Sequence, residues 1–165
     1  MNSKIKKIIL KKKKSKIVSL TAYSKNIAKI LDKYCDIILV GDSMANVLYA
    51  QKNTHNIKLQ NIIDHSISVR KGVKRSVLVV DMPKGSYSNS KKALKNAKLI
   101  INQTKADAVK LESNNSNFKI IELLVKKNIP VMGHIGYTPQ FKKKFKIECV
   151  GISSAKKLIK EALLI

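Results

Sequence analysis

Three acidic residues stand where short apolar stretches of the chain end. Asp42 follows the run Ile-Ile-Leu-Val-Gly, Asp81 follows Val-Leu-Val-Val, and Glu112 follows Ala-Val-Lys-Leu. Such runs are typical of strands that are buried on both faces of a parallel sheet. If these strands close into a barrel, the three carboxylates meet at its carboxyl-terminal mouth, and hard oxygen ligands suit Mg²⁺. The pattern therefore predicts a magnesium site formed by Asp42, Asp81 and Glu112.

A lysine and a histidine of the same region could add groups that bind a substrate. Lys110 lies two residues before Glu112, so the alternation of side chains along a strand puts both on one face. Its ammonium group could pair with a substrate carboxylate, and His134 could add a hydrogen-bond donor. A metal at this mouth could chelate a 2-oxo acid and stabilise the enolate formed when the neighbouring carbon loses a proton. Each residue alone also has a structural explanation, because an acid after a strand often caps the next helix.

Strand and helix patterns alternate along the whole chain, which indicates a parallel α/β sheet. Ser24 and Ser90 are the residue types that cap helices, and apolar residues such as Ile27 and Ile30 are expected to face inward. The expected strands are 17–20, 37–40, 76–81, 109–112 and 131–134, and the expected helices are 24–33, 59–70, 90–105, 118–127 and 153–164, after a short basic helix in residues 1–16.

Two architectures fit this alternation, an open doubly wound sheet and a (β/α)8 barrel. The sequence has no glycine-rich phosphate loop, and polar residues end all five strands instead of gathering at one switch point, which favours the barrel. A full barrel needs about 250 residues, whereas this chain has 165. We therefore expect residues 1–165 to form one incomplete barrel domain, with a basic helix in 1–16 and βα units 1 to 5 in 17–165.

The charge of the chain is strongly positive, formally +24 at pH 7. Arg70 and Arg75 are its only arginines, whereas proteins that read nucleic acids depend on arginine for base contacts. A solvated lysine surface is therefore favoured over a polyanion site, and no specific nucleic acid is expected as a partner. A lysine-rich protein that binds nucleic acid or an anionic surface without catalysis remains the alternative, with the dense runs 11–14 and 142–144 as its candidate sites.

The remaining composition points to a globular protein of a reducing compartment. Residues of the hydrophobic class make up 44% of the chain, enough for a real core. Cys35 and Cys149 belong to no cluster with metal-ligand spacing and indicate no disulfide framework. No apolar run approaches the roughly 20 residues needed to cross a bilayer, and the basic start lacks the apolar centre of a secretory signal. The expected location is the cytoplasm, without a membrane partner.

Five segments, taken together, resemble one enzyme family. Their order and spacing are similar to those of ketopantoate hydroxymethyltransferase from about Lys6 to the end of the chain, and His65 and residues 70–72 also resemble the second helix of that family. The segments are LTAY at 20–23, LVGDS at 39–43, VVDMP at 79–83, VKLE at 109–112 and GHIGYTPQ at 133–140.

The resemblance implies a (β/α)8 barrel enzyme of pantothenate and coenzyme A biosynthesis. Such an enzyme transfers a hydroxymethyl group from 5,10-methylenetetrahydrofolate to the 2-oxo acid 3-methyl-2-oxobutanoate, giving 2-dehydropantoate, and the full-length family implies a homo-oligomer. By the same resemblance, Mg²⁺ would be held by Asp42, Asp81 and Glu112. The 2-oxo acid would contact Asp42, Ser43, Asp81 and Lys110, with His134 in the neighbouring motif.

The chain departs from the family pattern in several places. The family's catalytic base is a glutamate on a later strand, in a segment that residues 1–165 do not contain, and Glu148 and Glu161 match no family motif. The run 141–145 stands where the family usually carries a Gly-Gly-Tyr lid. The GDS loop continues with Met44 and Ala45 where the family usually has a second glycine, and Lys84 stands where an apolar residue is typical. We expect a truncated enzyme that keeps most of the metal and 2-oxo acid site, folds poorly alone and catalyses little.

Overall fold

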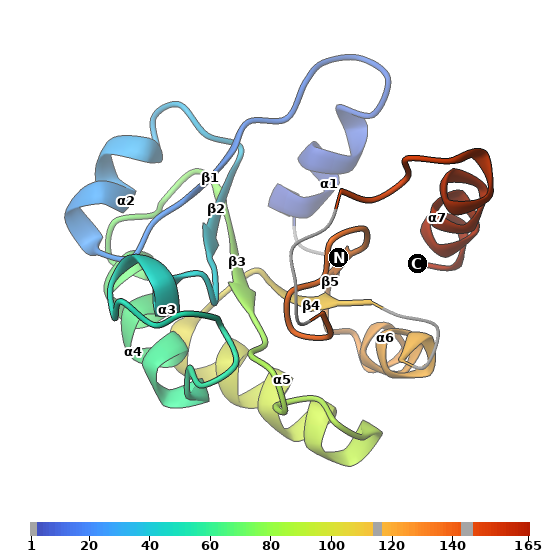
Figure 1. The fold of residues 1–165 in the computed structure, drawn as a ribbon. Helices are drawn as coiled ribbons and strands as arrows, with labels where there is room; N and C mark the ends of the chain where they lie inside the picture. Colours follow the sequence, from blue (N-terminus) through green and yellow to red (C-terminus); the bar gives the residue numbers. More distant parts are fainter. Residues whose placement is uncertain (1–2, 114–116, 143–146) are drawn as a thin grey trace.

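The computed structural model describes residues 3–113, 117–142 and 147–165, and a five-stranded parallel sheet forms its centre. The strands are paired in sequence order, so each strand lies beside the next one along the chain (Figure 1). This is the arrangement of five consecutive strands of a (β/α)8 barrel family, and the predicted α/β class is confirmed. The strands are β1 (Ser19–Thr21), β2 (Ile37–Val40), β3 (Val77–Asp81), β4 (Ala108–Glu112) and β5 (Val131–His134).

Helices cover the outer face of the sheet in the order of the strands that they connect. α4 packs on β2 and β3, α5 on β4 and α6 on β5, and successive helices of this layer contact each other. The main core lies in this layer and includes Leu78 and Val80 of β3 with Ile62, Ile63 and Ile100 of the helices. The helices are α1 (Ser3–Leu10), α2 (Lys25–Leu31), α3 (Met44–Val47), α4 (Leu59–Arg70), α5 (Ser90–Thr104), α6 (Phe118–Lys126) and α7 (Ile152–Leu164).

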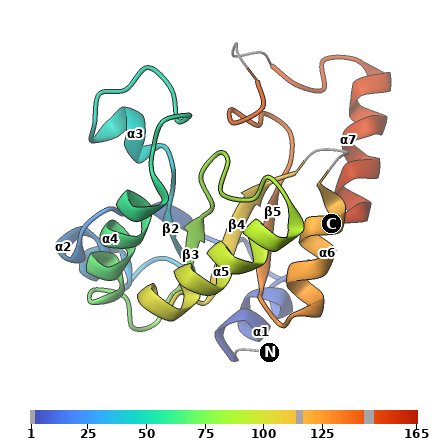
Figure 2. The ribbon, with the colours of Figure 1, turned by 90° about the horizontal axis from the view of Figure 1, so that it is seen from below.

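The first helix closes the opposite, inner face of the sheet at the amino-terminal ends of the strands. Ile5 and Ile8 of α1 pack against a second, smaller cluster that has residues from β2, β3 and β4. Lys4 anchors the helix, because its ammonium group donates hydrogen bonds to the carbonyl oxygens of Lys74 at 2.7 Å and Ser76 at 3.1 Å. Figure 2 shows α1 at one end of the sheet, with the loops after β2, β3 and β5 at the other. The smaller cluster consists of Ile37, Val77, Val79 and Ala108.

The last helix lies beside the β5 end of the sheet (Figure 1). Ile165, which follows α7, approaches β5 so closely that a Cβ built on Gly133 would come within 2.5 Å of its side chain. A side chain at position 133 would therefore push this end of the chain away from β5. Most apolar residues of α7 remain exposed, with Ile152 at 78% and Leu163 at 81%.

The expected boundaries of the five strands and of the helices at 24–33, 59–70, 90–105, 118–127 and 153–164 agree with the observed ones to within two residues. The first helix, expected within residues 1–16, ends at Leu10, and the short helix α3 was not expected. Two further details of the helices were wrong. Asn89, not Ser90, is the N-cap of α5, and its side chain accepts a hydrogen bond from the amide of Lys92. Ile27 and Ile30 of α2 are 50% and 58% exposed and do not face the core, because the smaller Ala28 occupies the buried position. Ser24 is at the N-cap of α2 as expected, although its side chain makes no capping hydrogen bond.

The distribution of lysines over the surface is relevant to the expected absence of a nucleic-acid partner. Lysines lie on α1, α2, α5, α6 and α7, so the positive charge is spread over helices on several sides of the sheet. The run 11–14 forms a turn after α1, whereas Lys143 and Lys144 of the second run lie outside the described residues. Among the helices that the structure describes, none combines the length and the apolar character that a membrane span requires.

Candidate functional site

The three acidic residues predicted from strand ends lie at one edge of the sheet. Asp81 and Glu112 are the last residues of β3 and β4, and Asp42 lies two residues beyond the end of β2. Their side chains are buried, with exposed fractions of 6% for Asp42, 3% for Asp81 and 2% for Glu112. Parallel strands place their carboxyl ends side by side, which is why residues about 30 to 40 positions apart in the sequence become neighbours here.

A buried ion pair links two adjacent strands at this edge. The register of β3 and β4 puts Asp81 beside Lys110, and Lys110 Nζ lies 2.9 Å from Asp81 Oδ1. The other oxygen of Asp81 accepts a hydrogen bond from the backbone amide of Asp42 at 3.0 Å. Asp81 therefore connects the ends of β2, β3 and β4, where the residues predicted to bind the metal and the substrate lie.

Ser43 lies next to this group and has a tyrosine partner. Its hydroxyl is 2.8 Å from the hydroxyl of Tyr23, which comes from the loop after β1. Either oxygen can donate in this pair, so one hydroxyl hydrogen remains available to a ligand. Gly41 precedes the two site residues, and a Cβ there would lie 3.1 Å from Ser43 Oγ and 3.5 Å from Asp81 Oδ2. A larger residue at position 41 would crowd the site.

Gln140 joins two of the acids from the loop after β5. Its side-chain amide donates hydrogen bonds to Asp42 Oδ2 at 2.8 Å and to the carbonyl oxygen of Met82 at 3.1 Å. Its backbone amide donates to Glu112 Oε2 at 2.9 Å. Tyr87 completes the network, since its hydroxyl donates to Gln140 Oε1 at 2.5 Å. Gln140 is only 2% exposed, so the loop brings a fully buried polar side chain into the mouth.

Burial raises the pKa values of all three carboxyl groups, and repulsion from neighbouring carboxylates adds to this for Asp42 and Glu112. For Asp42, burial is the main cause and the charge of Asp81 adds to it. Burial also raises the pKa of Asp81, against the opposing effect of Lys110. For Glu112, burial raises the pKa to about 7, although the hydrogen bond from Gln140 lowers it. A cation bound among these groups would offset the repulsion that their ionised forms experience.

His134 faces Glu112 but is not its ionic partner near neutral pH. The register of β4 and β5 pairs the two residues, and His134 Nδ1 lies 3.7 Å from Glu112 Oε1. Burial, followed by the charge of Lys110, lowers the pKa of His134 to about 4, so the ring is neutral at pH 7. Within the described part of the chain, Nδ1 is buried without a hydrogen-bond partner. The neutral ring can therefore offer this nitrogen to a ligand.

The chemistry of the site suits a hard cation, although its present spacing does not enclose one. Mg²⁺ usually binds one or two protein carboxylates and keeps positions for water or substrate oxygens, and Asp42 and Asp81 supply such groups. Among the described residues, however, no three acidic, histidine or cysteine side chains are grouped closely enough to hold an ion. Gln140 links Asp42 to Glu112. A cation that contacts both carboxylates would replace hydrogen bonds that Gln140 now makes.

Gln140 and Tyr87 are the residues that the sequence did not single out for the site. Gln140 ends the GHIGYTPQ segment, so its motif was visible, but its contact with Asp42 depends on how the loop after β5 folds back. Tyr87 had no comparable signal, because it lies in the loop between β3 and α5 without a motif of its own.

Comparisons with known proteins give a consistent result. A sequence model described as ketopantoate hydroxymethyltransferase matches residues 2–165. A Pelagibacter ubique protein named 3-methyl-2-oxobutanoate hydroxymethyltransferase is 52% identical over 165 residues, which is 100% of this chain and 64% of the relative. Proteins of the same name from Rhizobium etli and Campylobacter curvus are 48% and 44% identical, over 75% and 93% of this chain and 46% and 59% of their own lengths. The chain thus spans about half to two thirds of these relatives.

Proposed function

Because the chain belongs to the ketopantoate hydroxymethyltransferase family, we propose that it provides the metal and 2-oxo acid site of a hydroxymethyltransferase of pantothenate biosynthesis. The proposed reaction transfers a hydroxymethyl group from 5,10-methylenetetrahydrofolate to 3-methyl-2-oxobutanoate and gives 2-dehydropantoate. The observation that carries this proposal is the group of three buried carboxylates beside the ammonium of Lys110 at one edge of the sheet.

The proposed reaction consumes one water molecule. The C3–H bond of the 2-oxo acid breaks, as do both C–N bonds of the methylene carbon and one O–H bond of water. A C–C bond forms between C3 and the methylene carbon, and a C–O bond forms between that carbon and the water oxygen. The two released protons end on the two folate nitrogens. The enolate formed after loss of the C3 proton is the species that the site has to stabilise.

The acidic residues and Lys110 would have different roles in binding the 2-oxo acid and stabilising its enolate. Asp42, Asp81 and Glu112 would hold Mg²⁺, which supplies Lewis-acid polarisation of the 2-oxo group. Lys110, now paired with Asp81, would also attract the carboxylate of the 2-oxo acid. The ion pair keeps the ammonium at the mouth in the absence of substrate, so little reorganisation is needed on binding.

Two neutral groups would orient the same substrate. The hydroxyl of Ser43 or of its partner Tyr23 has a hydrogen to donate, and His134 offers a buried ring nitrogen. Because burial keeps His134 neutral, it can hydrogen bond without adding charge to a site that already contains a lysine and a divalent ion. No described residue is assigned the role of the base that removes the C3 proton.

The proposal for the whole enzyme includes polypeptide beyond the barrel units described above. The Pelagibacter relative is longer, since this chain covers 64% of it. We place the base and the last three βα units of the barrel in that additional length, as the family resemblance implies. The complete enzyme would be a homo-oligomer of the cytoplasm. The missing segment can be supplied as a separate polypeptide, taken from the part of a longer relative that follows the region matched by this chain. Adding it should restore turnover. If the two polypeptides are soluble and associate but do not turn over substrate, the proposal for the whole enzyme is wrong.

Calorimetric titration of 3-methyl-2-oxobutanoate into the purified chain tests the site itself. We expect binding that requires Mg²⁺ and is lost when Asp42→Ala and Asp81→Ala are combined. Asp64→Ala is the matched control, because Asp64 is an exposed acid on α4. Folded protein that binds no 2-oxo acid with Mg²⁺ would overturn the proposal. Affinity for RNA that persists at moderate salt would instead favour the lysine surface, since merely electrostatic contacts weaken steeply with salt.

A further inference from the structure

Three loops meet at the mouth of the acidic site, and His55 joins them. His55 belongs to the loop between α3 and α4, and its two ring nitrogens contact the two other loops. Nε2 lies 2.8 Å from the carbonyl oxygen of Pro139 in the loop after β5. Nδ1 lies 3.2 Å from Nζ of Lys84 in the loop after β3. Figure 2 shows the loops after β2, β3 and β5 together at the end of the sheet opposite α1.

These partners assign the tautomer of the His55 ring. A carbonyl oxygen can only accept a hydrogen bond, so Nε2 carries the hydrogen and donates to Pro139. An ammonium group can only donate, so Nδ1 accepts from Lys84. The ring is therefore neutral in this arrangement and is held from both sides. The backbone amide of His55 also donates to Asn53 Oδ1 at 2.9 Å, which holds the loop that carries the ring.

The hydrogen bond from His55 ends on a peptide group that also contacts Glu112. The carbonyl oxygen of Pro139 and the amide of Gln140 belong to one peptide unit, and this amide donates to Glu112 Oε2 at 2.9 Å. The unit is planar and trans, so its C=O and N–H bonds point in opposite directions. It thus bridges His55 on one side and Glu112 on the other. A rotation that takes the amide away from Glu112 also takes the carbonyl oxygen away from His55.

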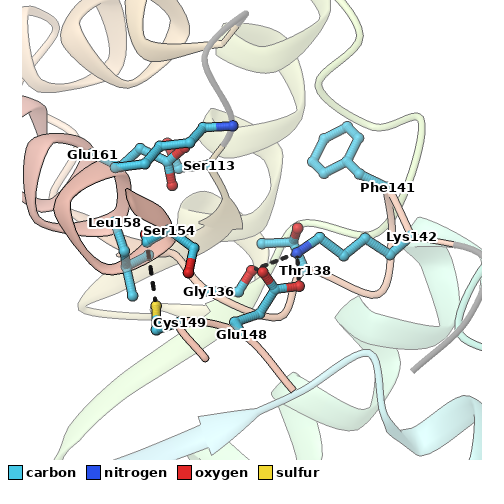
Figure 3. A pocket seen from close by; sticks show the side chains of 11 residues that line it. Ser113, Gly136, Thr138, Phe141, Lys142, Glu148, Cys149, Ser154, Leu158 and Glu161 are labelled. Carbon is cyan, nitrogen blue, oxygen red and sulfur yellow. Dashed lines mark hydrogen bonds and ion pairs between the residues drawn. The ribbon is translucent and has the colours of Figure 1, made fainter. Parts of the chain in front are cut away.

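The rest of the loop after β5 is held by its own contacts. The backbone amide of Lys142 donates to the carbonyl oxygen of Thr138 at 3.1 Å. Lys142 Nζ donates to the carbonyl oxygen of Gly136 at 3.1 Å and is bonded to Glu148 (Figure 3). The loop is therefore one bonded unit, and its contact with His55 fixes where this unit lies over the mouth.

The position of the loop decides which groups occupy the carboxylate oxygens. Gln140 donates its backbone amide to Glu112 and its side-chain amide to Asp42. A cation that binds both carboxylates through these oxygens has to displace Gln140. Because the amide of Gln140 moves together with the carbonyl group of Pro139, this displacement also breaks the hydrogen bond from His55. The free energy of that bond then opposes binding of the cation.

We propose that His55 is a positioning residue that, with the help of Lys84, holds Gln140 on the carboxylates and so opposes the binding of Mg²⁺. This inference rests on the proposed function, which requires Mg²⁺ at these carboxylates. His55 touches neither the substrate nor the metal and acts through the peptide group of Pro139 and Gln140. Without the cation, the contact keeps two buried carboxylates hydrogen bonded. When the cation binds, the contact is released and the loop after β5 rearranges.

Calorimetric titration of Mg²⁺ into His55→Phe tests this role. Phenylalanine keeps a ring at the half-buried position but cannot donate to Pro139. We expect Mg²⁺ to bind about threefold to tenfold more tightly than in the unmodified chain, as the loss of one opposing hydrogen bond predicts. His55→Gln should restore the original affinity, because its amide can donate to Pro139 and its oxygen can accept from Lys84. A merely structural role of His55 would leave the affinity unchanged or weaken it.

Lys84→Met removes the second partner of the ring and should also tighten Mg²⁺ binding, by less than His55→Phe does. Loss of one positive charge near the carboxylates would by itself favour a cation. Lys52→Met is the matched control for this charge, because Lys52 is an exposed lysine of the same loop as His55. If the two lysine variants tighten binding equally, the role assigned to Lys84 is wrong.

Hydrogen exchange of the Gln140 amide, measured by NMR without Mg²⁺, tests the peptide bridge directly. This amide should exchange about threefold to tenfold faster in His55→Phe, because the bond that helps to hold the peptide group is lost. An unchanged exchange rate, or a Mg²⁺ affinity that is unchanged or weaker, would overturn the role of His55. The proposed function would still stand if the unmodified chain binds 3-methyl-2-oxobutanoate with Mg²⁺. Folded protein that binds neither Mg²⁺ nor the 2-oxo acid would overturn both proposals.

Discussion

Gln140 donates a hydrogen bond to Asp42 across 98 positions of the sequence, at a distance of 2.8 Å. This contact joins the loop after β5 to the residue that follows β2, so it fastens two distant strand ends at the mouth. Because both side chains are buried, water cannot easily replace either partner. The bond is therefore expected to matter for stability as well as for the geometry of the acids.

Replacing Gln140 should destabilise the chain. In Gln140→Leu, the carboxylate of Asp42 and the hydroxyl of Tyr87 both lose a buried partner, which should lower the free energy of unfolding by about 2–4 kcal/mol. Urea denaturation measures this. Gln60→Leu is the control, because Gln60 is exposed and its side-chain amide donates a hydrogen bond to the exposed Asp64. Equal stability of the two variants would show that the buried network contributes little.

Glu112 should make the stability of the metal-free chain depend on pH. Its pKa is raised from 4.5 to about 7 in the folded state, so the folded state binds more protons than the unfolded state between these values. The preferential proton binding of the folded state contributes up to about 3 kcal/mol to the free energy of unfolding. This contribution is fully present below pH 4.5 and is lost as the pH rises through 7. Asp42 and Asp81 act in the same direction, since their pKa values are also raised.

Comparing Glu112→Gln with the unmodified chain separates the contribution of Glu112 from the pH dependence caused by the large positive charge, which both proteins share. Urea denaturation with a chelator should give similar stabilities for both proteins at pH 4.5. At pH 8 the unmodified chain should be the less stable of the two, and added Mg²⁺ should narrow the difference. A difference that stays constant from pH 4.5 to pH 8 would contradict the raised pKa.

Lys110 should be important for both stability and binding. Lys110→Met removes one partner of a buried ion pair and leaves Asp81 without its cation, which should cost about 3–5 kcal/mol. Mg²⁺ should recover part of this stability, and affinity for 3-methyl-2-oxobutanoate should fall at least about tenfold. Thermal unfolding and calorimetry measure the two effects. Lys126→Met, at an exposed pair on α6, should change neither quantity.

The first helix should stabilise the sheet through its apolar face. Ile8→Ala removes packing against the smaller cluster at the inner face of the sheet and should lower the free energy of unfolding by about 1–2 kcal/mol, less than at a fully buried site. Leu10→Ala is the matched control, because Leu10 is 65% exposed. Equal effects of the two substitutions in urea denaturation would mean that α1 is not packed as described.

The sequence was sufficient to predict the strand ends and the acids that lie at them or just beyond them. Asp42, Asp81 and Glu112 could be grouped because parallel strands place their ends together, and that rule needs only local patterns. Lys110 could be added because side chains alternate along a strand. The magnesium and substrate roles of these residues remain predictions.

Features that depend on distant packing could not be predicted in the same way. The contact of Gln140 with Asp42 requires a loop to fold back over the mouth, and no local pattern encodes that path. Ile27 and Ile30 were expected to face inward because their spacing is helical, but spacing does not show which face a neighbouring element covers. Asn89 and Ser90 are adjacent residues of capping type, so only the backbone geometry distinguishes them.

The packing of α1 has a consequence for the order in which the protein folds on the ribosome. Ile5 and Ile8 are synthesised first, but the cluster that they pack against includes Ala108, about 100 residues later. At roughly 5–20 residues per second, this partner follows about 5–20 s after the helix. An eight-residue segment is too short to hold a helix alone. The first helix of the chain is therefore expected to form late, after β4 has been synthesised and the apolar cluster that α1 packs against has formed on the sheet.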